Sequence, residues 1–182
     1  MTGKRWTALL AVAVAGCLLV VAAPAAASDR AGSSPARASY RGSMIDLTSG
    51  WHGAQSCAVF SRMDVRCFAS AAEADAALGY SRASDPLAAV APAAVPTCGS
   101  GWLCLYEFVN GGGRRLQFRD EFWNYLSDYG FDRQTSSWRN NQGSSDAGAL
   151  SLYNRSTVYT CGASTYVSSM GVYDNQAYAV WG

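Results

Sequence analysis

Histidine and lysine are almost absent from this sequence. His52 is the single histidine and Lys4 the single lysine among 182 residues. One histidine excludes, within one chain, a metal site built on a pair of histidines and the His-Glu-x-x-His motif of zinc peptidases. A serine or cysteine nucleophile would have to use His52 as its base, and no Gly-x-Ser-x-Gly turn is present to hold a serine. We therefore expect that the protein is not an enzyme.

Charge is also scarce, since Asp, Glu, Lys and Arg together make up 15% of the chain. Without the first 27 residues, 12 basic residues (14 − 2) face 13 acidic ones. This balance gives no electrostatic footprint for nucleic acid or for an anionic membrane, so neither is expected as a partner. The neighbouring carboxylates Asp120 and Glu121 are predicted to be solvated turn charges, because consecutive strand residues point to opposite faces.

The N-terminus has the pattern of an export signal. Lys4 and Arg5 precede an apolar run that ends in three alanines before Ser28, which predicts a signal peptide over residues 1–27 and a secreted, extracellular protein. Two alternatives remain. Cys17 lies in a lipobox-like sequence but is followed by more apolar residues, and the run is long enough for a membrane anchor. Cleavage is favoured, and it would leave no membrane attachment.

Five cysteines remain after cleavage, in a compartment that permits disulfides. Five cysteines allow 15 arrangements of two bridges (5 × 3), so the sequence alone does not fix the pairing. Local spacing makes Cys57–Cys67 and Cys98–Cys104 the simplest choice, with Cys161 as the odd thiol. A zinc site is the competing interpretation, but the spacings are wide and no histidine lies near the last three cysteines.

The N-terminal half divides by composition. Residues 28–43 are rich in Ser, Ala, Gly and Arg and predict a flexible leader. Residues 44–80 predict a small disulfide-stapled module of ββα type, whose helix begins at Ser70 with Glu73 three residues on, as in a capping box. Residues 81–97 are rich in alanine and proline, which is typical of an extended linker.

Residues 98–182 predict a β-structure. Leu103, Leu105 and Glu107 alternate as in a half-buried strand, the glycines 111–113 permit a tight reversal, and further short strands follow. The pattern Tyr106-Glu107, Gly113, Asp132, Ser136 and Ser137 resembles a βγ-crystallin Greek-key motif, although Gly111 stands where a second aromatic is usual.

A second, weaker copy of this pattern follows the first. Residues 149–153 repeat the entry strand, and residues 171–176 echo residues 130–134. Two halves of four short strands each predict an all-β, βγ-crystallin-like double Greek-key β-sandwich over 98–182. A different small antiparallel sheet is the alternative.

The crystallin resemblance implies a possible calcium site. In that family, two loops supply oxygen ligands to Ca²⁺, a hard cation. The matching residues here are Asp132 and Ser136 in the first loop and Asp174 and Asn175 in the second. Arg133 and Tyr178 stand where ligands are usual, so a site would be degenerate. Side-chain hydrogen bonds that tie down turns are the favoured explanation of the same residues, and no cofactor is required.

The segments 98–107, 112–120 and 129–140 resemble small secreted actinobacterial proteins of the metalloproteinase-inhibitor family, which have the βγ-crystallin fold. This resemblance implies a peptidase inhibitor that presents a rigid loop to an extracellular protease of thermolysin type. The Cys98–Cys104 segment, the turn around Gly111 and the loop 141–146 are the candidate elements. The alternatives are a Ca²⁺-modulated structural or stress protein, and a cell-wall or glycan-binding module that uses exposed aromatic rings. A monomer is expected.

Overall fold

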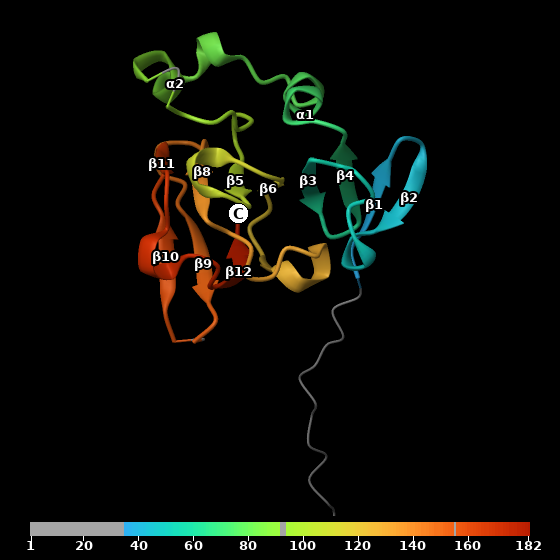
Figure 1. Ribbon diagram of the computed structural model, residues 1–182. Coiled ribbons are helices and arrows are strands. Elements are labelled where there is room, and N and C mark those ends of the chain that lie inside the picture. The colour runs from blue at the N-terminus through green and yellow to red at the C-terminus, as the bar shows by residue number, and fades with distance from the viewer. Residues whose placement is uncertain (1–34, 92–93, 155) are drawn as a thin grey trace, which may run out of the picture. The chain divides into compact units, whose positions relative to one another are not determined.

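The computed structural model describes residues 35–91, 94–154 and 156–182. The predicted signal peptide and the first part of the predicted leader lie outside the described residues. No helix in the described ranges is long and apolar enough to cross a bilayer. The described strands form two sheets, an eight-stranded sheet A and a four-stranded sheet B (Figure 1).

The first Greek key comprises β5 (Leu103–Tyr106), β6 (Arg115–Phe118), β7 (Trp123–Tyr125) and β8 (Ser137–Asn140). Strand β5 lies in sheet A between β6 and β8, antiparallel to both. The spatial order β8-β5-β6 is the 4-1-2 order of a Greek key. The third strand, β7, is the exception, because it joins sheet B beside β12.

The second Greek key repeats this arrangement with β9 (Gly148–Leu152), β10 (Val158–Cys161), β11 (Thr165–Val167) and β12 (Ala177–Trp181). Sheet B contains the order β10-β9-β12, and the third strand β11 crosses to sheet A beside β8. Each half therefore gives its third strand to the other half's sheet. The predicted all-β double Greek-key sandwich is confirmed.

The main core lies between the two sheets. Alternation along β5 sends Leu103 and Leu105 into this core and Cys104 and Tyr106 to the opposite face. Each fully buried Leu or Phe side chain stabilises the fold by about 1.5–3 kcal/mol. Core members from both sheets are Leu103, Leu105, Leu116, Phe118, Trp138, Leu150, Leu152 and Val180.

The predicted ββα module is present and is part of sheet A. Strands β3 (Ser56–Ser61) and β4 (Asp64–Phe68) pair antiparallel, and α1 (Ala71–Ala77) follows. The capping box at the start of α1 forms, since the Glu73 amide donates to Ser70 Oγ at 3.1 Å and the Glu73 carboxylate accepts from the Ala69 amide at 2.9 Å. Strand β3 also pairs in parallel with β6, so the sheet runs without a break from the Greek key into the module.

The end of the predicted leader, over 28–43, is in fact a strand. β1 (Arg37–Tyr40) pairs with β2 (Ser43–Asp46) and lies beside β4. The leader prediction is wrong for these residues because Ala38 and Tyr40 alternate inward and Arg41-Gly42, both at positive φ, make a tight turn. The short 3-10 helix η1 (Leu47–Ser49) follows.

The predicted extended linker, over 81–97, contains the 3-10 helix η2 (Arg82–Ser84) and the helix α2 (Pro86–Val90). A proline is compatible with a first helical turn, where its missing N–H has no partner to lose. Asp85 caps α2 by accepting from the amides of Leu87 and Ala88, at 3.2 and 3.1 Å. The prediction of a wholly extended segment is therefore wrong for residues 82–90.

Candidate functional site

Two loops meet where β5 begins and β8 ends. The Cys98–Cys104 disulfide closes the first loop, and residues 141–147 form the second. The Gly101 amide donates to the Asn141 carbonyl at 2.8 Å, and the Asn141 amide donates to the Trp102 carbonyl at 2.9 Å. The Asn141 side-chain amide also donates to the Cys98 carbonyl at 2.7 Å. Three hydrogen bonds thus fasten the second loop to the disulfide loop.

The base of the second loop is fixed from below by Asn140, whose side chain is buried. Its Nδ2 donates to the carbonyls of Asp146 and Cys161, at 2.9 and 3.0 Å, and its Oδ1 accepts from the Gln142 amide at 2.9 Å. At the far end of the loop, residues 143–145 are exposed, and a Cβ added at Gly143 would meet nothing within 4 Å. A rigid base therefore carries an open tip. We call residues 143–146 the braced tip.

The third candidate, the turn around Gly111, lies elsewhere. It follows β5 and includes the 3-10 helix η3 (Val109–Gly111), so it occupies the opposite end of that strand. Here Glu107 accepts hydrogen bonds from Arg114, at 3.0 Å from Nη2 and 3.1 Å from Nε, which lower the pKa of the Glu107 carboxyl. At Gly113, with φ +72°, a Cβ would lie 2.8 Å from the Glu107 Cβ. The contacts of Glu107 with Arg114 and Gly113 thus stabilise the turn after β5.

The two loops of the candidate calcium site lie against each other with reciprocal hydrogen bonds. The Arg133 amide donates to the Ala177 carbonyl at 2.9 Å, and the Asn175 amide donates to the Thr135 carbonyl at 3.1 Å. Arg133 and Asn175 both have positive φ, 51° and 55°. The loops are therefore equivalent under the pseudo-twofold relation of the two Greek keys, as the sequence echo predicts.

The side chains of that site are engaged with one another. Arg133 Nε lies 3.7 Å from an Asp132 carboxylate oxygen, and its guanidinium covers the ring of Tyr153 at 4.7 Å. Asn175 Nδ2 donates to the Asp174 carboxylate at 3.3 Å. Ser136 is buried. A calcium site at Asp132, Ser136, Asp174 and Asn175 stays a prediction, with the Arg133 charge beside it.

The outer face of sheet A is covered by the chain itself. Arg115 on β6 lies 2.8 Å from an Asp75 carboxylate oxygen of α1, and Arg139 on β8 forms an ion pair with Asp85, the cap of α2. The Tyr106 hydroxyl donates to the Thr97 carbonyl at 2.7 Å. These contacts could not be predicted from the sequence, because arginine at an alternating strand position ordinarily indicates a solvated face.

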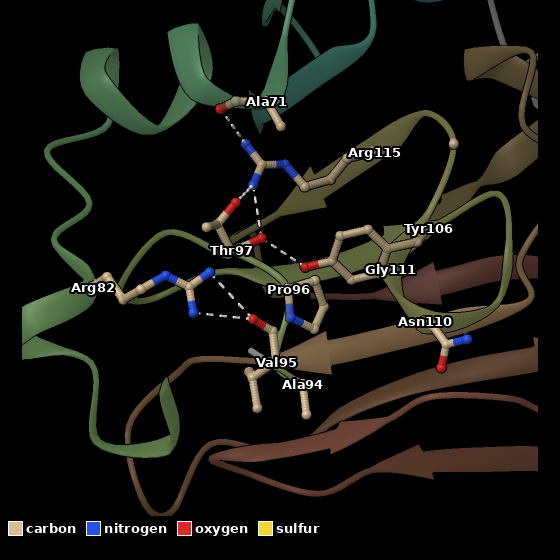
Figure 2. A pocket seen from close by; sticks show the side chains of 11 residues that line it. Ala71, Arg82, Ala94, Val95, Pro96, Thr97, Tyr106, Asn110, Gly111 and Arg115 are labelled. Atoms are coloured by element: carbon tan, nitrogen blue, oxygen red, sulfur yellow. Dashed lines mark hydrogen bonds between the residues drawn. The ribbon is translucent and has the colours of Figure 1, made fainter. Parts of the chain in front are cut away.

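A pocket of about 320 Å³ lies beside this covered face (Figure 2). Its two arginines hold the chain in place: Arg115 donates to the carbonyls of Thr97 and Ala71, at 2.7 and 3.1 Å, and Arg82 donates twice to the Val95 carbonyl at 3.3 Å. Figure 2 shows both guanidinium groups directed at these backbone oxygens. Both arginines of the pocket are thus engaged with backbone carbonyls of the protein itself.

The cysteine that lies near His52 in the sequence is not a free nucleophile. His52 is exposed, and Cys57 is bonded to Cys67. The disulfides found are the two that local spacing indicated, and they leave Cys57, Cys67, Cys98 and Cys104 without a free thiol for zinc. Cys161 is a buried free thiol whose pKa is raised well above its usual value by burial. Within residues 35–91, 94–154 and 156–182, no three His, Cys, Asp or Glu side chains are grouped to hold a metal ion.

Asp120 is less solvated than predicted. Burial raises the pKa of its carboxyl, and a hydrogen bond from Asn124 at 3.0 Å opposes that shift.

Comparison with known proteins identifies one family that part of the chain resembles. Residues 91–173, a little under half of the chain, match the model of peptidase inhibitor family I36. This part of the chain resembles a peptidase-inhibitor domain. The matched residues include both joined loops and strands β5 to β11. The family resemblance inferred from the sequence is thereby confirmed.

Curated proteins give no match to the chain. Among solved structures, the chain is similar to one described as "Evolution of the eye lens beta-gamma-crystallin domain fold", at 16% identity and a TM-score of 0.40. That match covers 47% of this chain and 91% of the other. The fold is assigned from the exchange of the third strands, β7 and β11, between the two sheets, and not from this structural similarity.

Proposed function

We propose that the protein is a secreted inhibitor of an extracellular peptidase and that it meets its target with the braced tip, residues 143–146. The observation that carries this proposal is the fixing of the loop base by Asn140 and Asn141 beside the Cys98–Cys104 loop. The family match supports a peptidase as the partner class. A metallopeptidase of thermolysin type is the proposed target, from the family resemblance.

The physical basis is preorganisation. A loop that is already fixed loses little conformational entropy on entering a cleft, so more of its contact energy appears as affinity. Here the side-chain amides of Asn140 and Asn141 hold the carbonyls of Asp146 and Cys98 at 2.9 and 2.7 Å. Cleavage of a bond in the tip would leave both new ends held by the same contacts. The loop is therefore expected to bind tightly and to be cut slowly.

An experiment with a steric block tests the position of the contact. Ser145→Cys in the tip and Val109→Cys at the opposite end of β5 would each be coupled to a bulky maleimide. Cys161 is buried and is expected to stay unmodified. Inhibition of a thermolysin-type peptidase is then titrated, and modified Ser145→Cys is expected to lose inhibition by at least tenfold.

The matched control is modified Val109→Cys, whose parent side chain is 46% exposed and far from the tip along β5. It is expected to inhibit like the unmodified protein. Loss of inhibition in this control alone would transfer the contact to the turn around Gly111. If the unmodified protein inhibits neither metallo- nor serine peptidases, the proposed function is wrong.

Calcium binding is the second candidate, supported by the reciprocal contact of its two loops. A ligand that binds only the folded state raises the unfolding midpoint, so melting with and without Ca²⁺ tests it. An unchanged midpoint at millimolar Ca²⁺ would reject the site.

A further inference from the structure

The outer face of sheet B carries no charged side chain on any of its strands. The strands are β7 (WNY), β9 (GALSL), β10 (VYTC) and β12 (AYAVW). Their inward residues, such as Leu150 and Val180, belong to the main core. Their outward residues are aromatic, small or hydroxylated. The nearest charges are at the rim: Glu121 just before β7, and Arg62, which donates to the Trp123 carbonyl at 3.0 Å.

Aromatic rings are concentrated on this face, and we call Trp123, Tyr125, Tyr178 and Trp181 the aromatic face. Trp123 and Trp181 are opposite each other in the β7–β12 ladder, and their rings make an edge contact at 5.9 Å. Tyr125 and Tyr178 stack at 6.2 Å. Trp123 and Tyr125 are 37% and 46% exposed. Because they are two positions apart on one strand, they point to the same side, roughly 7 Å apart.

The rings are held in place although they are open to solvent. The Trp181 indole N–H donates to the Glu121 carboxylate at 3.0 Å, and each ring is packed against an aromatic neighbour. Fixed rings lose little rotamer freedom when a ligand arrives. The aromatic face is therefore preorganised for stacking.

The two outer faces of the sandwich differ in which one the chain covers, and the burial of apolar area does not explain the choice. The chain covers the outer face of sheet A, which contains Arg115 and Arg139, and leaves the aromatic face of sheet B exposed. The hydrophobic effect would favour covering the aromatic face instead, since aromatic side chains lose the most from contact with water. Contiguous exposed apolar area of this kind marks a binding surface.

We propose that the aromatic face binds an uncharged polysaccharide, with pyranose rings stacked on Trp123, Tyr125 and Trp181. An uncharged face complements an uncharged ligand. Its strands carry no cation for a phosphate, a sulfated glycan or an anionic lipid headgroup, and Arg62 at the rim is turned to the Trp123 carbonyl. The C–H bonds on the face of a pyranose match the negative face of an aromatic ring, while the Trp and Tyr polar groups at the ring edges can meet sugar hydroxyls. The proposed site uses none of the residues of the braced tip.

Sedimentation of the secreted protein with insoluble chitin, cellulose and β-1,3-glucan tests the proposal. Retention is expected on at least one of these polymers and not on immobilised heparin. Trp123→Ala and Tyr125→Ala are each expected to weaken retention about tenfold, and Trp123→Phe, which keeps a ring, is expected to weaken it less. Thermal unfolding of each variant confirms that the fold is intact.

The matched control is Tyr153→Ala, because Tyr153 is a 57% exposed aromatic beyond the end of β9. It is expected to leave retention unchanged. Three results would overturn the proposal: no retention on any neutral polymer, equal retention of folded Trp123→Ala and wild type, or a dimer that Trp123→Ala dissociates. The last result would make a second copy of the chain the occupant.

Discussion

Arg115 and Arg139 are buried charges on the outer face of sheet A, each paired with a carboxylate from the segment that covers this face. We call residues 71–91 and 94–97 of that segment the strap. The two arginine side chains are 2% and 0% exposed. A buried ion pair contributes little net stability, but removing one partner leaves an uncompensated charge and costs several kcal/mol. These pairs therefore fix the position of the strap on sheet A, and their net contribution to the free energy of folding is small.

The substitution Asp85→Asn tests the cost of leaving Arg139 without its carboxylate partner. Asparagine keeps the helix cap of α2 but removes the charge opposite Arg139, so the free energy of unfolding is expected to fall by about 3–5 kcal/mol. Urea denaturation at pH 7 measures it. The control is Asp64→Asn, which breaks the exposed pair with Arg66 and is expected to change stability little.

The Asp85–Arg139 pair also makes the free energy of unfolding depend on pH. Burial alone would raise the pKa of Asp85, but hydrogen bonds from Arg139 and Tyr80 outweigh it, so the folded-state pKa lies below the usual value. The unfolded state then binds more protons at acid pH, and the stabilisation is present above about pH 4 and lost as the pH falls through the folded pKa. The stability difference between wild type and Asp85→Asn should shrink below pH 4. A constant difference down to pH 2 would contradict this assignment.

At the scale of elements, the two disulfides have similar loop lengths and different surroundings. Cys57–Cys67 joins the paired strands β3 and β4, whereas Cys98–Cys104 closes the loop against which the braced tip is fastened. Removing either bridge should lower stability by roughly 2–3 kcal/mol, from the loop-closure entropy of the unfolded chain. Only one of them bears on the proposed contact with a peptidase.

Paired serine variants separate these roles. Cys98→Ser with Cys104→Ser is expected to weaken inhibition at least tenfold and to speed cleavage of the protein by its target, because the loop base is loosened. Cys57→Ser with Cys67→Ser should lower the unfolding midpoint comparably without changing inhibition. Inhibition titrations at a temperature where both variants stay folded make the comparison. Equal inhibition by the two pairs would mean that the disulfide loop does not support the contact.

Several elements follow from local sequence signals. The alternation from Leu103, the turn at Gly113 and the Ser70–Glu73 capping box all have the structures predicted from their residues. The parallel pairing of β3 with β6 and the exchange of β7 and β11 between sheets leave no local signal, because they depend on contacts far apart in sequence. Strand β1 was missed because only four residues alternate.

The candidate site was predictable to a lesser degree. The family resemblance and the cysteine spacing indicated the disulfide loop and the loop 141–146, but not the hydrogen bonds that join them. The aromatic face could not be predicted, because Trp123 and Tyr125 alternate with Asn124 and either set could face inward. Only the packing of Val180 and Leu150 in the core fixes which side is open.

At the scale of the whole molecule, the described residues before Cys98, from Ala36 on, pair with or pack against the sandwich. β3 pairs with β6, the Trp51 indole N–H donates to the Tyr129 carbonyl at 2.8 Å, and a Cβ at Gly130 would lie 2.2 Å from the Leu47 carbonyl oxygen. Removing residues 28–97 would leave β6 as an edge strand and would strip Arg115 and Arg139 of their carboxylates.

The truncated chain 98–182 is therefore expected to be much less stable than the chain 28–182. Its urea midpoint should fall, its slope against urea should decrease because less surface is buried, and its inhibition should fail at temperatures where the longer chain still inhibits. Mass spectrometry of the secreted protein gives the complementary measurement, since a stable product that begins near Cys98 would mean that the strap is a removable pro-segment. A midpoint equal to that of the longer chain would likewise show that the Greek keys fold without β3. The ion pairs of Asp75 and Asp85 would then hold the strap on a sheet that does not need it.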